Sequence, residues 1–252
     1  MRYELMLPHQ IRQAIEDNVP VVLPLGVLEY HGEHLPVGMD TLAVTRIIDH
    51  LEPDLPMVIM PAFYYGAASY AVAGPEGKGS LHVDAETIVP VAKQIFTGLL
   101  RIGFRNLHGF IHHQTENFQA GMPTDLAFKL AARQAIFAYV ERQRGEGWWG
   151  DETLADYYAK QATGSDPFNW IKIHPLLSPE IIAQFPFDHA GIGETSLMMS
   201  LCPDTVDMAR SVDSDWYTRS AAAASQELGN KGRDLILASL RKILAVEPVT
   251  KP

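Results

Sequence analysis

Residues 21–41, VVLPLGVLEYHGEHLPVGMDT, decide the expected fold. They begin with the apolar run VVLPL, which ends at Gly26. A short apolar run bounded by a glycine is typical of a buried strand in a parallel sheet. Open α/β sheets place their binding groups just beyond the carboxyl ends of strands. In this chain that position is filled by acidic and imidazole side chains: Glu29, His31, Glu33, His34 and Asp40.

Two interpretations of this polar segment are open from residue chemistry alone. A carboxylate, an imidazole and a second carboxylate suit a divalent ion such as Zn²⁺ or Mn²⁺. The alternative is a solvated loop in which acids and histidines neutralise one another, and Gly32, Pro36 and Gly38 are typical of a loop. Leu28 and Leu35 are interleaved with the charges, which favours a partly buried metal site.

The rest of the chain alternates between predicted strands and helices. Further strands are predicted at residues 57–60 (MVIM) and 107–111 (LHGFI). Apolar residues at helical spacing predict helices at residues 8–18, 41–51 with Thr41 as the cap, 85–102, 117–144 with an interruption near Pro123, and 214–245 with interruptions at Gly229 and Gly232. A further helix is expected at residues 195–201. The alternation predicts an α/β fold with three layers, α/β/α, around a mostly parallel central sheet. Residues 162–175 are predicted to form a turn-rich insertion, and the tail after Glu247 is predicted to be frayed.

Composition limits the class of protein. The chain has 252 residues, of which 47% are hydrophobic and 20% charged, so one globular domain over residues 1–252 is expected. A net charge of -10 with no basic stripe argues against nucleic acid as a partner. Cys202 is the only cysteine, and no apolar run approaches the ~20 residues that span a bilayer. We therefore expect a cytoplasmic, soluble protein without a membrane partner.

The polar segment resembles the signature of the creatininase (creatinine amidohydrolase) family. The pattern there runs approximately G-x-x-E-Q-H-G-x-H-L-P-x-x-T-D, and this chain departs from it at Tyr30 and Met39. The positions that match in register are Gly26, Glu29, His31, Gly32, His34, Leu35, Pro36 and Asp40.

A second resemblance follows the strand predicted at residues 107–111. The family strand ends in a motif such as N-G-H-Y-E-N, whereas this chain has HHQTEN at residues 112–117. Alignment on the preceding GFR places the family histidine on His113, with His112 as the fallback. One of these adjacent histidines is expected to point away from the site, because neighbouring strand residues face opposite sides. The family's Glu-Asn pair falls on Glu116 and Asn117, one residue later than the pattern.

A third resemblance lies at residues 188–196, DHAGIGETS, which is similar to the family pattern H-A-G-x-x-E-T-S. His189 matches the histidine that serves as acid or base in the family, and Glu194 matches the nearby glutamate. The tryptophan that precedes this histidine in the family is absent, and Phe185 lies nearby instead. A first-turn helix anion is a competing reason for Glu194.

The resemblance implies a centre of two divalent ions, Zn or Mn. Asp40 would bridge them, Glu29 and His113 would bind one ion, and His31 and Glu116 the other. A shared water would become a hydroxide nucleophile. The implied catalytic residues are Glu116, together with His189, which would pass a proton to the leaving group, and Glu194, which with Asp188 is a candidate for orienting it. His34 would donate to a ligand carboxylate.

The implied function is metal-dependent hydrolysis of a carbon–nitrogen bond in a small cyclic amide or formamide. One alternative is a hydrolase that opens a cyclic ketone or lactone ring of a sugar- or inositol-like substrate. Another is a non-catalytic protein with a structural or degenerate metal site, which the extra residue in HHQTEN keeps open. Creatininases form hexamers, so the resemblance also implies a homo-oligomer, for which an exposed pair, Trp148 and Trp149, would provide a contact.

Overall fold

The computed structural model describes residues 1–160 and 166–245, and its centre is a parallel sheet. The four strands lie in the order β2-β1-β3-β4, and every pair of neighbours is parallel. Their bounds are β1 Val21–Leu25, β2 Val58–Ile59, β3 Leu107–Ile111 and β4 Ile171–Pro175. The predicted strands at residues 57–60 and 107–111 are confirmed, as is the parallel sheet.

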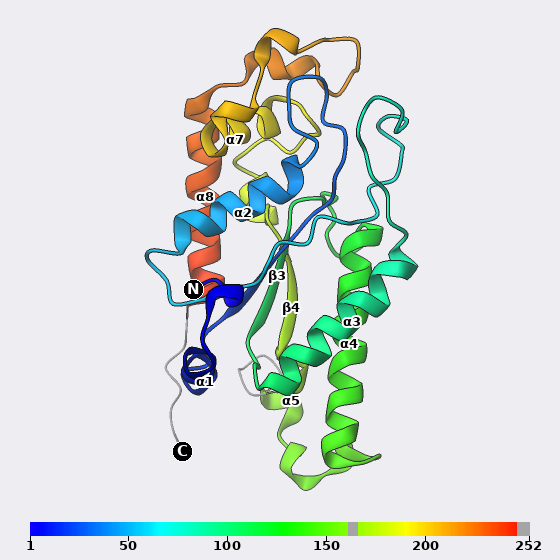
Figure 1. The fold of residues 1–252 in the computed structure, drawn as a ribbon, viewed down its shortest axis with the longest axis vertical. Helices are drawn as coiled ribbons and strands as arrows, with labels where there is room; N and C mark the ends of the chain where they lie inside the picture. Colours follow the sequence, from blue (N-terminus) through cyan, green and yellow to red (C-terminus); the bar gives the residue numbers. More distant parts are fainter. Residues whose placement is uncertain (161–165, 246–252) are drawn as a thin grey trace.

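Helices cover both faces of this sheet (Figure 1). On one side lie α3 and α4, and on the other lie α2, α7 and α8. The three-layer α/β/α prediction is therefore confirmed. The bounds are α1 Pro8–Glu16, α2 Met39–Leu51, α3 Ala85–Ile102, α4 Pro123–Arg144, α5 Tyr157–Lys160, α6 Pro179–Ile182, α7 Ile192–Leu201 and α8 Gln226–Leu244, with short 3-10 turns between several of them.

Strand β1 shows how the sequence produces these layers. Successive side chains of a strand point to opposite faces, so both faces of a central strand must be apolar. Val21, Leu23 and Leu25 contribute to the core against α3 and α4, whereas Val22 contributes to the core against α2, α7 and α8. All five residues of β1 are buried. The strand therefore ends inside the molecule, and the segment that follows begins there.

Several predicted elements are corrected by the structure, among them the last helix, α8, which begins at Gln226 and not at residue 214. Helix α2 begins at Met39 after Gly38, so Thr41 lies inside the helix and does not cap it. Helix α4 begins at Pro123, and residues 117–122 are not helical. Strand β4 occupies part of the stretch predicted as a turn-rich insertion; residues 161–165 of that region, like the tail after Glu247, lie outside the described residues.

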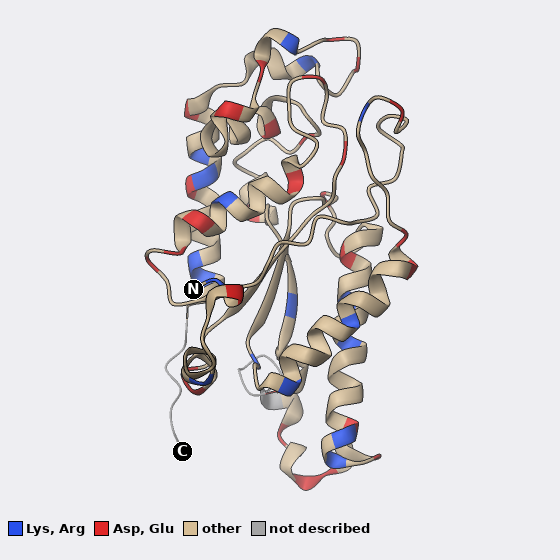
Figure 2. Cartoon of the chain, in the orientation of Figure 1, with Lys and Arg blue, Asp and Glu red and all other residues tan. Residues whose placement is uncertain are grey.

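Of the two neighbouring tryptophans, Trp149 is exposed and Trp148 is buried. Trp148 is 7% exposed and packs its ring near Phe137 and Phe168, whereas Trp149 is 48% exposed. The prediction of two exposed neighbouring tryptophans is therefore wrong for Trp148. In the view of Figure 2, lysine and arginine are scattered over several elements without forming a stripe. Among the described residues, no helix combines the length and the apolar character that crossing a bilayer requires.

Helix α8 packs against α7 at unusually short range. A Cβ placed on Gly229 would lie 1.8 Å from the backbone oxygen of Ser196, and one on Gly232 would lie 2.5 Å from the ring of Phe185. These glycines do not interrupt the helix, which runs unbroken through both. Gly229 lets α8 approach α7, the helix that carries Glu194, and Gly232 lets α8 approach Phe185.

Replacing Gly229 with alanine is expected to destabilise the protein by about 1–3 kcal/mol, because the methyl group meets backbone that cannot move aside. The matched control is Gly98→Ala in α3, where an added Cβ meets nothing within 4 Å. That change should stabilise the protein by about 0.5–1 kcal/mol through helix propensity alone. Thermal unfolding followed by circular dichroism measures both, and equal shifts of Tm would contradict the close-packing account.

Candidate metal centre

The end of β1 brings three acidic and imidazole side chains into one buried place. Glu29 and His31 lie on the segment after the strand, and Asp40 lies in the first turn of α2. Gly26 allows this arrangement, because a Cβ there would lie 2.2 Å from Oγ1 of Thr41 in α2. The segment closes on itself where the backbone N–H of Glu29 donates to the carbonyl of Val37 at 2.8 Å.

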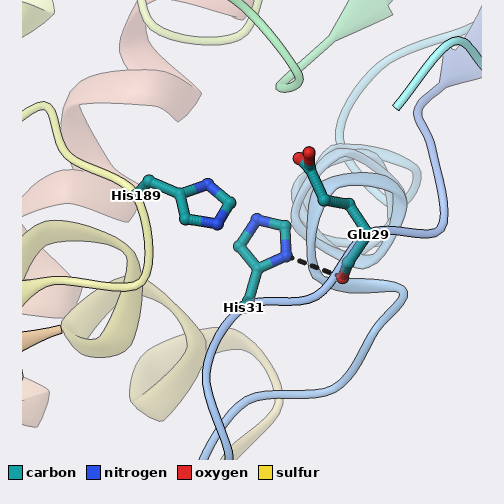
Figure 3. Close-up of side chains that lie close together, drawn as sticks. All are labelled: Glu29, His31 and His189. Carbon is teal, nitrogen blue, oxygen red and sulfur yellow. Dashed lines mark hydrogen bonds between the residues drawn. The ribbon is translucent and has the colours of Figure 1, made fainter. Parts of the chain in front are cut away.

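His31 is oriented for binding by its own backbone. Its Nδ1 lies 2.9 Å from the carbonyl oxygen of Glu29 (Figure 3), and since a carbonyl only accepts, Nδ1 carries the hydrogen. In the neutral ring this leaves Nε2 with the free lone pair, which is the arrangement of a histidine ligand. That Nε2 lies 3.7 Å from Oδ2 of Asp40 and 3.6 Å from Oε2 of Glu194. The ring is fully buried.

His113 approaches the same carboxylates from the end of β3. Its Nδ1 lies 3.2 Å from Oε2 of Glu29 and 3.6 Å from Oδ2 of Asp40. Glu29 and His113 come from the segments that follow β1 and β3, which are neighbouring strands. An open α/β sheet is expected to bring such segments together.

Possible ligand atoms fall into three groups, in each of which they lie within 4.8 Å of one another. The groups are Glu29, Asp40 and His113; His31, Asp40 and Glu194; and Glu29, His31 and His189. Asp40 belongs to the first two. Within the described residues, Nε2 of His31 and Oδ2 of Asp40, which lie 3.7 Å apart, are buried and have no hydrogen-bond partner. Buried polar atoms are normally satisfied, so these orphaned atoms, with their nitrogen and oxygen chemistry, fit bound Zn²⁺ or Mn²⁺.

Residues 188–196, the third stretch that resembles the family, reach the site through a tight turn into α7. The carboxylate of Asp188 accepts from the backbone N–H groups of Gly191, Gly193 and Glu194 at 3.2, 2.6 and 3.1 Å. This turn places His189 beside His31, with ring centroids 4.2 Å apart (Figure 3). His189 Nε2 donates to the carbonyl of Tyr30 at 3.0 Å, so neither Asp188 nor Glu194 holds its ring as predicted.

Burial and the neighbouring opposite charges shift the pKa values of this cluster in opposite directions. Burial alone lowers the pKa of His113, but the carboxylates of Asp40 and Glu29 outweigh it and raise the pKa to about 10. The pKa of His31 is raised in the same way, against burial, by Asp40, Glu194 and Glu29. Burial acts to raise the pKa of Asp40 and of Glu194, but the facing imidazoles, His31 foremost, hold both pKa values below their usual range. Without an ion, protons on the imidazoles balance the buried carboxylates.

Glu116 does not reach the cluster. Its side chain is exposed, its carboxylate accepts from Oγ1 of Thr115 at 3.0 Å, and it belongs to none of the three groups. The reason is Gln114, whose side-chain amide both donates to and accepts from the backbone of Leu177, at 2.9 and 3.0 Å. The chain is anchored there and turns outward, so the geometry does not support the predicted roles of Glu116 as ligand and catalytic residue.

Two other histidines differ from expectation. His34 does not donate to a ligand carboxylate; its Nε2 lies 2.9 Å from Oγ1 of Thr195. His112 is buried beside His113 and its Nε2 lies 3.0 Å from Oε1 of Glu194, so both adjacent histidines contact the cluster. The sequence offered His112 only as the fallback for His113 and predicted that one of the two would point away, so the contact of both with the cluster was not expected.

A cavity of about 520 Å³ opens onto these groups. Its polar part includes Glu29, Asp40, His112, His113, His189 and Glu194. Apolar and aromatic side chains form the rest, among them Ala68, Val72, Phe187 and Trp216. No lysine or arginine lines it within the part of the chain that the structure describes.

Comparison with known proteins identifies the family. Residues 4–239 match the family described as creatinine amidohydrolase. The chain belongs to the creatininase family. Its similarity to the creatinine amidohydrolase of Pseudomonas putida is 27% identity over 207 residues, which cover 81% of this chain and 72% of that protein. The members of this family are hydrolases, so the predicted family and enzyme class are confirmed.

Other known proteins match over part of the chain or in fold. The 3-dehydro-scyllo-inosose hydrolase of Thermotoga maritima is 26% identical over 103 residues, covering 41% of this chain and 32% of that protein. A tryptophan mutant of creatininase has a TM-score of 0.71 at 20% identity, covering 96% of each chain. Solved creatininases include an Mn form, with a TM-score of 0.67 at 19% identity and coverage of 97% and 99%, and a Zn–Zn form. These structural matches show the shared fold.

Metal binding to this protein should release protons. At pH 7.5 His113 is protonated without an ion, because its pKa is about 10, and an imidazole must lose that proton to bind. The apparent affinity should therefore fall by about tenfold per pH unit as the pH drops below the pKa. Calorimetric titration with Zn²⁺ in two buffers of different ionisation enthalpy measures the protons released, and enthalpies independent of the buffer would contradict the expectation.

Proposed function

We propose that this chain is a two-metal hydrolase that cleaves a carbon–nitrogen bond in a small cyclic amide or formamide. The observation that carries the proposal is the position of Asp40, which two groups of possible ligands share. A carboxylate that two such groups share would serve as a ligand in both halves of a two-metal site. Glu29, Asp40 and His113 would hold one Zn²⁺ or Mn²⁺, and His31, Asp40 and Glu194 the other.

When bound, two such ions supply Lewis acidity for a carbonyl and lower the pKa of a shared water. The protein contributes the geometry for this chemistry. His31 keeps Nε2 toward Asp40 and Glu194 through its bond to the Glu29 carbonyl. Asp188 fixes the turn that presents His189 and Glu194 through three backbone hydrogen bonds. Holding these groups in place before substrate arrives reduces the reorganisation that the reaction requires.

His189 is proposed to exchange a proton with the leaving group. It lines the cavity, and its bond to the Tyr30 carbonyl fixes the hydrogen on Nε2. In the neutral ring Nδ1 is then free to accept a proton and pass it on. His189 also belongs to a third group of possible ligands, so its role as proton carrier needs a test that separates it from metal binding.

The cavity narrows the substrate class. Among the described residues it has no lysine or arginine to pair with a carboxylate or phosphate, whereas aromatic and small apolar residues form much of its wall. A neutral ring or formamide of modest size fits these properties. The similarity to an inosose hydrolase over 103 residues supports the second candidate, opening of a cyclic ketone or lactone in a sugar- or inositol-like ring.

A purely structural metal site fits the geometry less well. Structural zinc sites are closed by four protein ligands. In this chain a cavity reaches the ligand groups directly, which leaves space for water and substrate. The predictions of one domain over residues 1–252, of a homo-oligomer such as a hexamer, and of a cytoplasmic location stay predictions.

The first test is the metal content of the purified protein. Wild type should hold about two ions of Zn or Mn per chain, and Asp40→Asn, which keeps the shape but removes the charge, should hold fewer than one. The wild-type protein should hydrolyse members of a panel of neutral cyclic amides, formamides and lactones. A wild type that binds no metal and is not activated by added Zn²⁺ or Mn²⁺ would contradict the proposal.

The second test concerns His189. His189→Asn should lower kcat by about 10²- to 10⁴-fold, the usual contribution of general acid–base catalysis, while the metal content stays at two ions. His9→Asn is a suitable control, because that histidine is exposed on α1 and lies outside the cavity. Loss of an ion from the His189 variant would assign the residue to metal binding instead.

A further inference from the structure

We propose that His112 is a positioning residue for the second group of possible metal ligands, His31, Asp40 and Glu194. It holds Glu194 beside His31 and Asp40, so that Glu194 takes the place that sequence alignment gives to Glu116. This inference rests on the proposed two-metal function and adds the device that makes the second group possible in this chain.

The two oxygens of Glu194 are fixed by different donors. Oε1 accepts from Nε2 of His112 at 3.0 Å, and Oε2 accepts from the backbone N–H of Ala190 at 2.6 Å. The second oxygen also lies 3.6 Å from Nε2 of His31. Two donors on opposite oxygens fix the plane of the carboxylate as well as its position. An ionised carboxylate has about four acceptor sites, so both oxygens can still bind an ion.

Within the part of the chain that the structure describes, His112 makes no side-chain hydrogen bond other than the one to Glu194. It is 3% exposed, and its Nδ1 has no hydrogen-bond partner among the described residues. Since a carboxylate only accepts, the hydrogen on Nε2 is committed to Glu194. A buried imidazole with this single side-chain hydrogen bond contributes to the site through Glu194.

The chain needs this device because Glu116 is absent from the cluster. The side chain of Gln114 is tied to the backbone of Leu177, and the segment beyond it carries Glu116 to the surface. The second group would otherwise consist of His31 and the shared Asp40. Glu194 comes from a distant part of the chain, and His112 connects it to the end of β3, next to His113.

The test compares substitutions at one position. His112→Leu removes the donor, His112→Asn keeps an amide that is too short to reach Glu194, and His112→Gln restores a donor at similar reach. Calorimetric titration with Mn²⁺ measures both sites, and electron paramagnetic resonance distinguishes a coupled ion pair from a single ion. The matched control is Glu116→Gln, which alters the alternative carboxylate.

Wild type and Glu116→Gln should each bind two ions with a coupled signal. His112→Leu and His112→Asn should keep the first ion and bind the second about 10- to 100-fold more weakly, the usual effect of losing a residue that orients a metal ligand. His112→Gln should recover most of that loss. A structural role alone would lower Tm without changing one site selectively, and the Asn variant answers the question if the Leu variant does not fold.

Each contrary result has a distinct meaning. If wild type binds fewer than two ions, the proposed two-metal function itself fails. If wild type binds two ions and the Leu and Asn variants bind both equally well, the role of His112 is overturned and the two-metal function stands. Loss of the second ion in Glu116→Gln would overturn the inference by restoring Glu116 as the ligand.

Discussion

The site depends on the burial of the Asp40 carboxylate. Asp40 is 2% exposed and lies between His31 and His113, with Glu29 and Glu194 nearby. Moving such charges out of water costs several kcal/mol per ion, and paired burial seldom stabilises a fold more than apolar packing would. Stability therefore does not explain three carboxylates and their imidazoles in one place. Binding of divalent ions does, because it satisfies the buried atoms that the protein leaves without partners.

The elements that the sequence predicted well are those with a strong local pattern. Helix α3 has the predicted bounds because its apolar residues repeat at helical period up to Gly103. Strand β4, with the sequence IKIHP, was missed because it lies at the edge of the sheet. Edge strands tolerate lysine and proline, so no continuous apolar run marks them. Gly229 and Gly232 were interpreted as breaks because their contacts with Ser196 and Phe185 are distant in the sequence.

The candidate site shows the same division between local and distant information. Glu29, His31, Asp40 and His113 follow strands, and the structure brings them together as their positions predicted. Glu116 could not be placed from the sequence, because its position depends on the contact of Gln114 with Leu177, 63 residues away. The contact on which the proposed role of His112 rests is in the same way with Glu194, 82 residues away. Motif spacing predicts which residue types are present, and tertiary contacts decide which of them face the ions.

The most direct measurement of the central claim is anomalous diffraction from crystals of the protein grown with Mn²⁺ or Zn²⁺. The account predicts two metal peaks about 3.5–4 Å apart, on either side of Asp40, with Glu29 and His113 at one and His31 and Glu194 at the other. Glu116 should remain at the surface. A single ion enclosed by four protein ligands, or no peak at Asp40, would contradict the account.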